Sequence, residues 1–190
     1  MARRDDWHRI GTACRTHGTY LLATCPGCQR PFRDQRHSPL RVVGPQTLCG
    51  NPLGQGPRKQ CRVDLTTLTA EPADDDCLQR QARQDAAEAG GTVATFAGGL
   101  DAPEFTATLR SLTALVLHLA AASRTPDNLP CWARDVADAS TRSIRRWSIR
   151  PPQDPVLRSR ALTAADRILA VEDIDTAAAR FGQWLRHVPD

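Results

Sequence analysis

Two pairs of candidate metal ligands near the N-terminus constrain this chain more than any other feature of its sequence. Cys14-x-x-His17 and Cys25-x-x-Cys28 each hold two ligands separated by two residues. This gap lets one tight turn direct both side chains at a single metal ion, which is why structural zinc sites use it. The second pair encloses a Pro-Gly dipeptide, which favours a turn that wraps around a tetrahedral ion.

Two later cysteines, Cys49 and Cys61, bring the candidate ligands to six. Spacing alone favours one ion held by the four residues of the two pairs. The alternative without a metal is a set of buried or oxidised cysteines. The sequence shows no secretory signal that would direct it to an oxidising compartment, so the paired pattern favours a metal, with zinc as the expected ion. Cys77 and Cys131 are isolated, and we expect them to be free structural thiols.

The length of 190 residues allows one domain, or a small metal-built module joined to a second small one. Hydrophobic residues make up 41% of the sequence, which is enough for a modest core. No uninterrupted apolar run approaches the roughly 18 residues that a membrane helix needs. We therefore expect a cytoplasmic protein with no membrane contact.

Charge is distributed unevenly along the chain. Residues 1–63 carry eleven basic side chains against three carboxylates, a net charge of +8. Residues 64–108 carry two against nine, a net of −7, and residues 109–190 carry twelve against nine, a net of +3. A basic, cysteine-bearing front indicates a module that faces a polyanion such as DNA. Solvated arginines on a small, irregular surface are the plainer explanation.

Seven arginines are candidate nucleic-acid contacts. Residues 29–36 place arginines around Phe32, and such a mixture can bind a strand by phosphate contact and stacking. A hydrophobic cover over the metal module is the alternative role for Phe32. Trp132–Trp147 has the apolar spacing of a helix-turn-helix, whose second helix would enter the major groove; the alternative is a short helix followed by a basic linker. The candidates are Arg30, Arg33, Arg36, Arg41, Arg142, Arg145 and Arg146.

The first 68 residues show little periodicity. Short strands are expected at residues 40–43 and 63–68, on either side of a Gly- and Pro-rich loop. Beyond residue 74 the pattern becomes helical. Helices are expected over residues 74–89, 102–122, 156–170 and 174–187, with a Gly-bounded connector or strand at 92–99.

The longest predicted helix, residues 102–122, is the expected spine of the second half. Its apolar stripe consists of Phe105, Leu109, Leu112, Val116 and Leu119, and Leu115 widens it. The last helix has an apolar face made of Ile174, Ala177, Ala178, Phe181, Trp184 and Leu185. The expected fold class is mostly α, with a small zinc-ribbon or zinc-knuckle module at residues 1–68 and a helical domain at residues 69–190.

Catalytic motifs are absent from the sequence. There is no Gly-rich phosphate loop, nucleophile elbow or His-Glu-x-x-His pattern. Thiolate-rich ligands with turn spacing are typical of a closed structural site, whereas a zinc enzyme keeps a coordination position open for water. We therefore expect no enzymatic activity and no small-molecule substrate.

The order of motifs from residue 7 to residue 66 resembles the zinc-finger region of the TniQ family, whose members assist DNA transposition. The matching residues are Trp7, Ala13-Cys14-x-x-His17-Gly18, Leu21-Leu22, Cys25-Pro26-x-Cys28, Cys49-Gly-Asn-Pro52 and Cys61-Arg-Val-Asp-Leu65. The resemblance continues faintly through residues 102–122 and 151–170. It implies a non-catalytic adaptor that links target-site recognition to a transposition ATPase, and some members of the family bind nucleic acid.

The resemblance also implies a metal assignment that differs from the one suggested by spacing. Cys25, Cys28, Cys49 and Cys61 would form one closed zinc ribbon. In the family, an upstream Cys-x-x-Cys pair joins the Cys-x-x-His pair, so the Cys14–His17 pair would be half of another site. The sequence contains no such upstream pair, so either the true start lies further upstream or the first site has degenerated.

Three hypotheses follow for the function. The leading one is a TniQ-like, zinc-stabilised adaptor that contacts DNA through its basic front and a transposition protein through its helical half. The second is a stand-alone zinc-containing regulator that reads DNA with residues 132–147. The third is a degenerate transposon remnant without activity.

Overall fold

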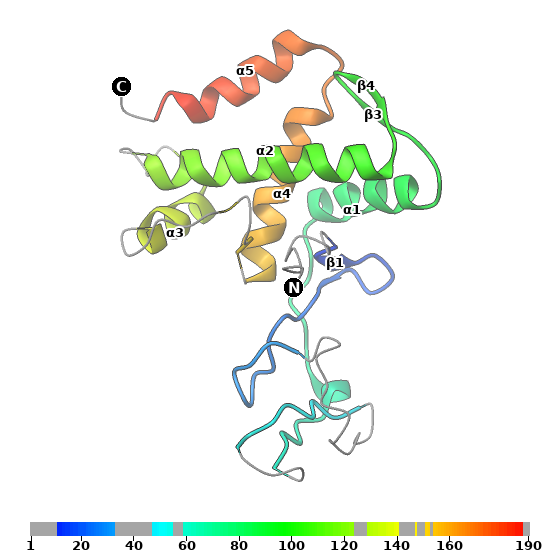
Figure 1. Cartoon of the computed structure of the whole chain (residues 1–190), viewed down its shortest axis with the longest axis vertical. Helices are drawn as coiled ribbons and strands as arrows, with labels where there is room; N and C mark the ends of the chain where they lie inside the picture. Colours follow the sequence, from blue (N-terminus) through cyan, green and yellow to red (C-terminus); the bar gives the residue numbers. More distant parts are fainter. Residues whose placement is uncertain are drawn as a thin grey trace, which may run out of the picture.

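Helix α2 (Ala102–Ala122) is the central element of the computed structural model (Figure 1). The structure describes residues 11–32, 47–54, 59–123, 129–140, 147, 151–152 and 154–187. Around α2 pack α1 (Asp75–Glu88), α3 (Cys131–Ser140), α4 (Pro155–Leu169) and α5 (Ile174–Leu185). The described part of the chain is thus mostly helical, as the sequence predicts.

Aspartates begin four of these helices by accepting a hydrogen bond from a backbone N–H of the first turn, which would otherwise lack a partner. In α2, Asp101 and Glu104 form a reciprocal capping box, and the backbone N–H of Glu104 lies 2.9 Å from Asp101 Oδ1. The equivalent caps of α1, α4 and α5 are Asp74, Asp154 and Asp173. These caps explain why the four predicted helix starts agree with the structure to within a residue or two.

The helices enclose two adjoining hydrophobic clusters, both built in part from residues of α2 and α4, and Phe96 and Leu112 pack against both. One contains Phe105 and Leu109, both fully buried, together with Leu162 from α4. The other contains Val116 and Leu117 and extends to α3, to α5 and to Trp147. β3 (Val93–Thr95) and β4 (Gly98–Leu100) form an antiparallel hairpin at residues 93–100, where the sequence predicts a connector or a strand.

A second hairpin, made of β1 (Ala13–Cys14) and β2 (Thr19–Tyr20), packs against α1. Arg80 of α1 is fully buried beneath it and donates from Nη2 to Thr12 Oγ1 at 2.7 Å. The Tyr20 hydroxyl donates to Asp74 Oδ2 at 2.8 Å. Both bonds join the N-terminal hairpin to the helical part of the molecule.

The chain leaves the hairpin and returns to it along neighbouring paths. Tyr20 donates its backbone N–H to the Glu71 carbonyl, and Ala73 donates to the Gly18 carbonyl, each at 2.9 Å. Between these two passages lies the segment that contains the later cysteines, which extends away from the helices in Figure 1. The segment meets the helical part through this narrow neck.

Three expectations about local structure, for residues 63–68, for Leu115 and for the apolar face of α5, differ from the structure, and one stays untested. The predicted strand at 63–68 contains a 3-10 helix, η1 (Leu65–Thr67), because the Asp64 side chain accepts from the backbone N–H and the hydroxyl of Thr66. Leu115 is 50% exposed, since the neighbouring helices cover the face of α2 that carries Thr113 and Leu117 instead. The predicted strand at 40–43 lies outside the described residues.

The third difference concerns the apolar face of α5. Ala177 and Trp184 are buried and Phe181 packs against the core, whereas Ile174 and Leu185 are 68% and 50% exposed. A helix at the edge of the bundle contacts its neighbours along a narrow stripe, so the ends of its apolar face remain in solvent.

Among the described helices, α2 alone is long and apolar enough to cross a membrane by length and composition. The core helix of a soluble protein meets the same criterion. Here α2 packs against four other helices, which accounts for its apolar composition.

Candidate metal centre

The loop of residues 23–32 turns tightly around Cys25 and Cys28. The backbone N–H of Gln29 donates to the Cys25 carbonyl at 2.8 Å, and the N–H of Cys25 donates to the Arg30 carbonyl at 2.9 Å. Gly27 at the tip lies against Val63, where a Cβ atom would be only 2.4 Å from Val63 Cγ2. A residue larger than glycine would therefore push the turn away from the opposite loop.

The other two cysteines lie on paired segments of a second loop. Cys49 donates its backbone N–H to the Val63 carbonyl at 2.9 Å, and Cys61 donates to the Asn51 carbonyl at 2.7 Å. Gly50 permits the bend between them, since its φ is +64°. This antiparallel pairing brings Cys49 and Cys61 to the same place although they are twelve residues apart in sequence.

The four sulfur atoms of Cys25, Cys28, Cys49 and Cys61 all lie within 4.8 Å of one another. The separation is 3.8 Å between Cys25 Sγ and Cys61 Sγ, and 3.9 Å between Cys28 Sγ and Cys49 Sγ. A tetrahedral ion with metal–sulfur bonds of about 2.3 Å requires sulfur atoms about 3.8 Å apart. Disulfide sulfurs would be separated by about 2 Å, and all four thiols are free. These four residues could therefore hold one metal ion.

A hydrophobic shell and one amide surround the sulfur atoms. Phe32, Val63 and Leu65 are partly buried against the cluster. Asn51 is buried, and its Nδ2 donates to the Pro31 carbonyl at 3.0 Å and to Cys28 Sγ at 3.4 Å. The position of Phe32 agrees with a cover over the module. The role of Asn51 was not predicted, although its place two residues after a ligand was a usable signal.

The thiols differ in how easily they lose a proton. Burial raises the pKa of Cys28, but hydrogen bonds from the Asn51 side chain and the backbone at Arg30 outweigh it and lower this pKa to about 7. Burial raises the pKa of Cys49 to about 12. At Cys61 a backbone hydrogen bond at Val63 lowers the pKa. Burial and the neighbouring Cys25 thiol together raise it by more, so the net change in the pKa is upward. A cation among the sulfurs would stabilise the thiolates of Cys49 and Cys61, whose raised pKa values otherwise keep them protonated at neutral pH.

Cys14 and His17 form a separate pair on the β1–β2 hairpin. Cys14 Sγ lies 3.1 Å from His17 Nδ1, and hydrogen bonds from the backbone and side chain of His17 lower the pKa of the Cys14 thiol. Neither residue joins the cluster of four thiols, which is the one group of three or more candidate ligands in the described parts of the chain. The structure therefore assembles the set implied by the family resemblance, and not the set favoured by spacing alone.

Of the candidate nucleic-acid contacts, the structure describes Arg30. Its exposed side chain donates from Nη1 to the Pro52 carbonyl, which links the two loops of the metal module. The first helix of the predicted helix-turn-helix is present as α3. Outside the described residues lie Arg33, Arg36, Arg41, Arg142, Arg145 and Arg146.

The two remaining cysteines lie far from the cluster in sequence and differ in environment. Cys77 is buried, and its sulfur lies 2.6 Å from Ser159 Oγ at the contact between α1 and α4. Cys131 is exposed at the start of α3. Both thiols are free, as expected from their isolation.

Comparison of the chain with protein-family models, with curated proteins and with solved structures finds no match.

Proposed function

We propose that this protein is a zinc-stabilised, non-catalytic adaptor of the TniQ type, which links recognition of target DNA to a transposition ATPase. In this proposal, the zinc-binding, DNA-facing module lies within residues 1–68, of which the β1–β2 hairpin packs on α1. Residues 69–190 form the partner-binding helical domain, and the protein acts in the cytoplasm. The observation that carries the proposal is the group of four thiols within 4.8 Å of one another.

Zinc is the ion that suits this group best. Four cysteines with tetrahedral spacing are typical of structural zinc sites, which have no open position for water. The surrounding loops contribute few apolar side chains, the closest being Phe32, Val63 and Leu65. A bound ion could supply on the order of 10 kcal/mol of folding free energy to such a module. A closed site of this kind stabilises a surface and does not activate a substrate.

The geometry also explains the residue types in Cys49-Gly-Asn-Pro52, one of the motifs on which the family resemblance rests. In Cys49-Gly-Asn-Pro52, the first residue supplies a thiol, the glycine adopts a positive φ, and the asparagine donates to another cysteine and to the opposite loop. Three of the four positions of the motif thus serve the same centre. This agreement is consistent with the proposed TniQ-type module.

The proposed DNA contact rests on the charge of the front. Residues 1–63 carry a net charge of +8, and Arg30 lies on the surface of the module. Because phosphate contacts release counterions, affinity for duplex DNA should fall steeply with salt. Arg30→Ala should weaken binding and reduce the slope of log K against log salt by about 1. Arg186, an exposed arginine at the end of α5, provides the control Arg186→Ala, which should leave the slope unchanged.

Two measurements test this function. Fluorescence anisotropy with a labelled duplex gives the salt slope of the wild type and both variants. A flat salt dependence would contradict the basic front as the contact surface. Co-purification with a transposition ATPase encoded beside the gene tests the adaptor role, which predicts a complex of ATPase, adaptor and DNA. An ATPase that binds DNA equally well without this protein would contradict it.

A further inference from the structure

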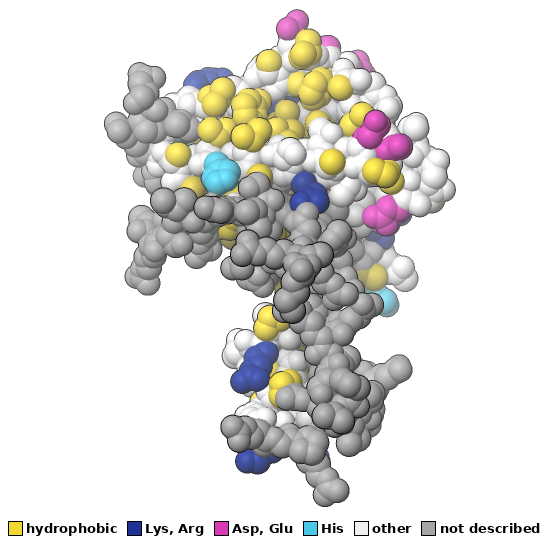
Figure 2. All heavy atoms as spheres, viewed as in Figure 1, with side chains coloured by type: hydrophobic (Ala, Val, Ile, Leu, Met, Phe, Trp, Pro, Cys, Tyr) yellow, Lys and Arg dark blue, Asp and Glu magenta, His cyan; other side chains and the backbone are white. Residues whose placement is uncertain are grey.

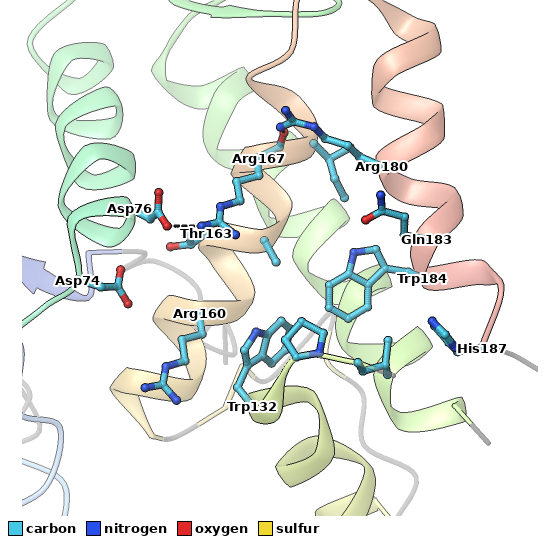
Figure 3. Close-up of a pocket in the computed structure, with 14 residues that line it drawn as sticks. Asp74, Asp76, Trp132, Arg160, Thr163, Arg167, Arg180, Gln183, Trp184 and His187 are labelled. Atoms are coloured by element: carbon cyan, nitrogen blue, oxygen red, sulfur yellow. Dashed lines mark hydrogen bonds and ion pairs between the residues drawn. The ribbon is translucent and has the colours of Figure 1, made fainter. Parts of the chain in front are cut away.

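A groove of about 730 Å³ lies between α3, α4 and α5, in the helical half of the molecule (Figure 3). Trp132 of α3 and Trp184 of α5 lie at its floor, each 8% exposed, with ring centroids 5.5 Å apart and planes tilted by 45°. The α4 wall carries Arg160 and Thr163, and the α5 wall carries Arg180. Side chains from three separate elements thus meet around one hollow of ligand size.

Positive charge predominates around this groove. Of its arginines, Arg167 pairs with Asp76, as the dashed line in Figure 3 marks. Arg180 donates to the carbonyl of Arg167. Neither Arg180 nor Arg160 forms an ion pair with a carboxylate among the described residues. Asp74, the other acid of the groove, already accepts from the Tyr20 hydroxyl and from the backbone of α1. The groove therefore has three arginines against two aspartates in its lining, and two of its guanidinium groups form no ion pair with a described carboxylate.

Thr163 supplies an independent sign that the groove receives a ligand. The residue is 9% exposed, and its Oγ1 is buried without a hydrogen-bond partner in the described structure. Buried hydroxyl groups nearly always have a partner, and one without a partner destabilises the fold. The hydroxyl of Thr113 in α2, by comparison, donates to the Leu109 carbonyl at 2.6 Å. A polar ligand in the groove would give the Thr163 hydroxyl the partner that it lacks.

We propose that this groove binds a nucleotide. A nucleotide combines a flat ring, which suits the floor of Trp132 and Trp184, with a phosphate, which suits Arg160 and Arg180. The exposed amide of Gln183, on the same wall as Arg180, can exchange hydrogen bonds with the edge of a base. An acidic peptide would satisfy the arginines but leave the aromatic floor unfilled. A free mononucleotide and one unit of a single strand share the required chemistry.

This proposal goes beyond the zinc-dependent contact with duplex DNA and does not depend on it. The groove lies on the helices, whereas the thiol cluster lies beyond the neck formed by Tyr20 and Ala73 with their partners. A variant that loses the metal site, Cys49→Ser/Cys61→Ser, should therefore still bind a short single strand. Loss of binding in this variant would place the strand on the metal module and overturn the groove proposal, while leaving the zinc proposal intact.

The test uses fluorescein-labelled oligo-dT of five nucleotides and the full chain, with affinity measured by anisotropy at low salt. Arg160→Glu should weaken binding about tenfold, because it reverses a charge on the groove wall. Arg186→Glu is the matched control, since Arg186 is also an exposed arginine but does not line the groove, and it should change affinity less than about twofold. Equal affinity of wild type and Arg160→Glu would overturn the proposal.

Thr163→Val separates a ligand-binding role from a structural one. The variant keeps the shape of the side chain and removes the unpartnered hydroxyl, so its denaturation midpoint should equal or exceed that of the wild type. Its affinity for the oligonucleotide should fall severalfold. A variant that is less stable, or that binds as well as the wild type, would contradict the proposal.

Competition identifies the source of the nucleotide. Displacement of the labelled strand by adenosine monophosphate indicates a site for free mononucleotides, and failure to displace it indicates a site for one unit of a strand. Displacement by a penta-glutamate peptide but not by the monophosphate would assign the groove to an acidic protein partner and overturn the proposal.

Discussion

The side chain of Asn51 connects both loops of the candidate metal centre. It donates to the Pro31 carbonyl and to Cys28 Sγ, and it is buried. The bond to the sulfur stabilises the thiolate, and the bond to the carbonyl holds the loop of Cys25 and Cys28 against the loop of Cys49 and Cys61. Residues in such positions around metal ligands orient the ligands and adjust their basicity.

Replacing this residue tests its role. Asn51→Ala should lower the affinity for zinc by about 10- to 100-fold, because it removes the bond to a ligand and leaves the Pro31 carbonyl without a donor. Competition with a coloured chelator measures the affinity. Thr67→Ala, on the exposed surface of η1, is the control and should change the affinity little. An Asn51→Ala protein that holds zinc as tightly as the wild type would contradict this role.

Tyr20 offers a second test at the scale of one residue, because it is the one tyrosine in the sequence. Burial, and then the hydrogen bond to Asp74, raise its pKa to about 12 from the usual 10. Since the folded state holds this proton more tightly, the stabilisation is complete below pH 10 and is lost as pH rises through about 12.

Titration of the phenol absorbance should therefore give a midpoint near 12 while circular dichroism shows that the helices remain. Asp74→Asn should move the midpoint towards 10, since the neutral amide removes the nearby negative charge but can still cap α1. A midpoint near 10 in the folded wild type would show that the hairpin does not pack on α1 as described.

At the scale of elements, α2 shows what periodicity can and cannot predict. Its bounds agree with the sequence prediction because Asp101, Glu104 and a proline in the first turn are local signals. Which side is buried depends on four other helices, and this information is not local. The apolar stripe predicted from the sequence therefore included Leu115, which is half exposed, and missed Leu117, which is fully buried.

These two leucines form a matched pair for measurement. Leu117→Ala should cost about 2–5 kcal/mol of unfolding free energy, because it leaves a cavity in the core. Leu115→Ala should change it by less than about 0.5 kcal/mol, as expected for an exposed position. Chemical denaturation followed by circular dichroism measures both. Equal losses in the two variants would contradict the described packing of α2.

The metal module illustrates the same limit of local information. The sequence supplies six candidate ligands, but spacing favours Cys14, His17, Cys25 and Cys28, which are near each other along the chain. The structure instead joins Cys25 and Cys28 to cysteines more than twenty residues away, through backbone pairing within the second loop. The resemblance to TniQ-type motifs implied this set, whereas spacing along the chain does not indicate which distant segments pair.

For the molecule as a whole, the helical half and the metal module differ in how much apolar packing stabilises them. The helical half is held by its hydrophobic clusters, and the β1–β2 hairpin is fixed to it by buried Arg80 and by Tyr20. Hydrophobic side chains also gather on one surface of this half (Figure 2). The module beyond the neck has a few apolar side chains around four thiols. Metal removal should therefore disorder the module and leave most of the helical signal in place.

The most direct test of the central claim is the zinc content per chain, measured by elemental analysis in the wild type and in Cys49→Ser/Cys61→Ser. We predict about one zinc ion in the wild type, none in the double variant, and similar helical content in both. A double variant that keeps its zinc would place the ion in the segment from Cys14 to Cys28, and a wild type without zinc would contradict the metal centre itself.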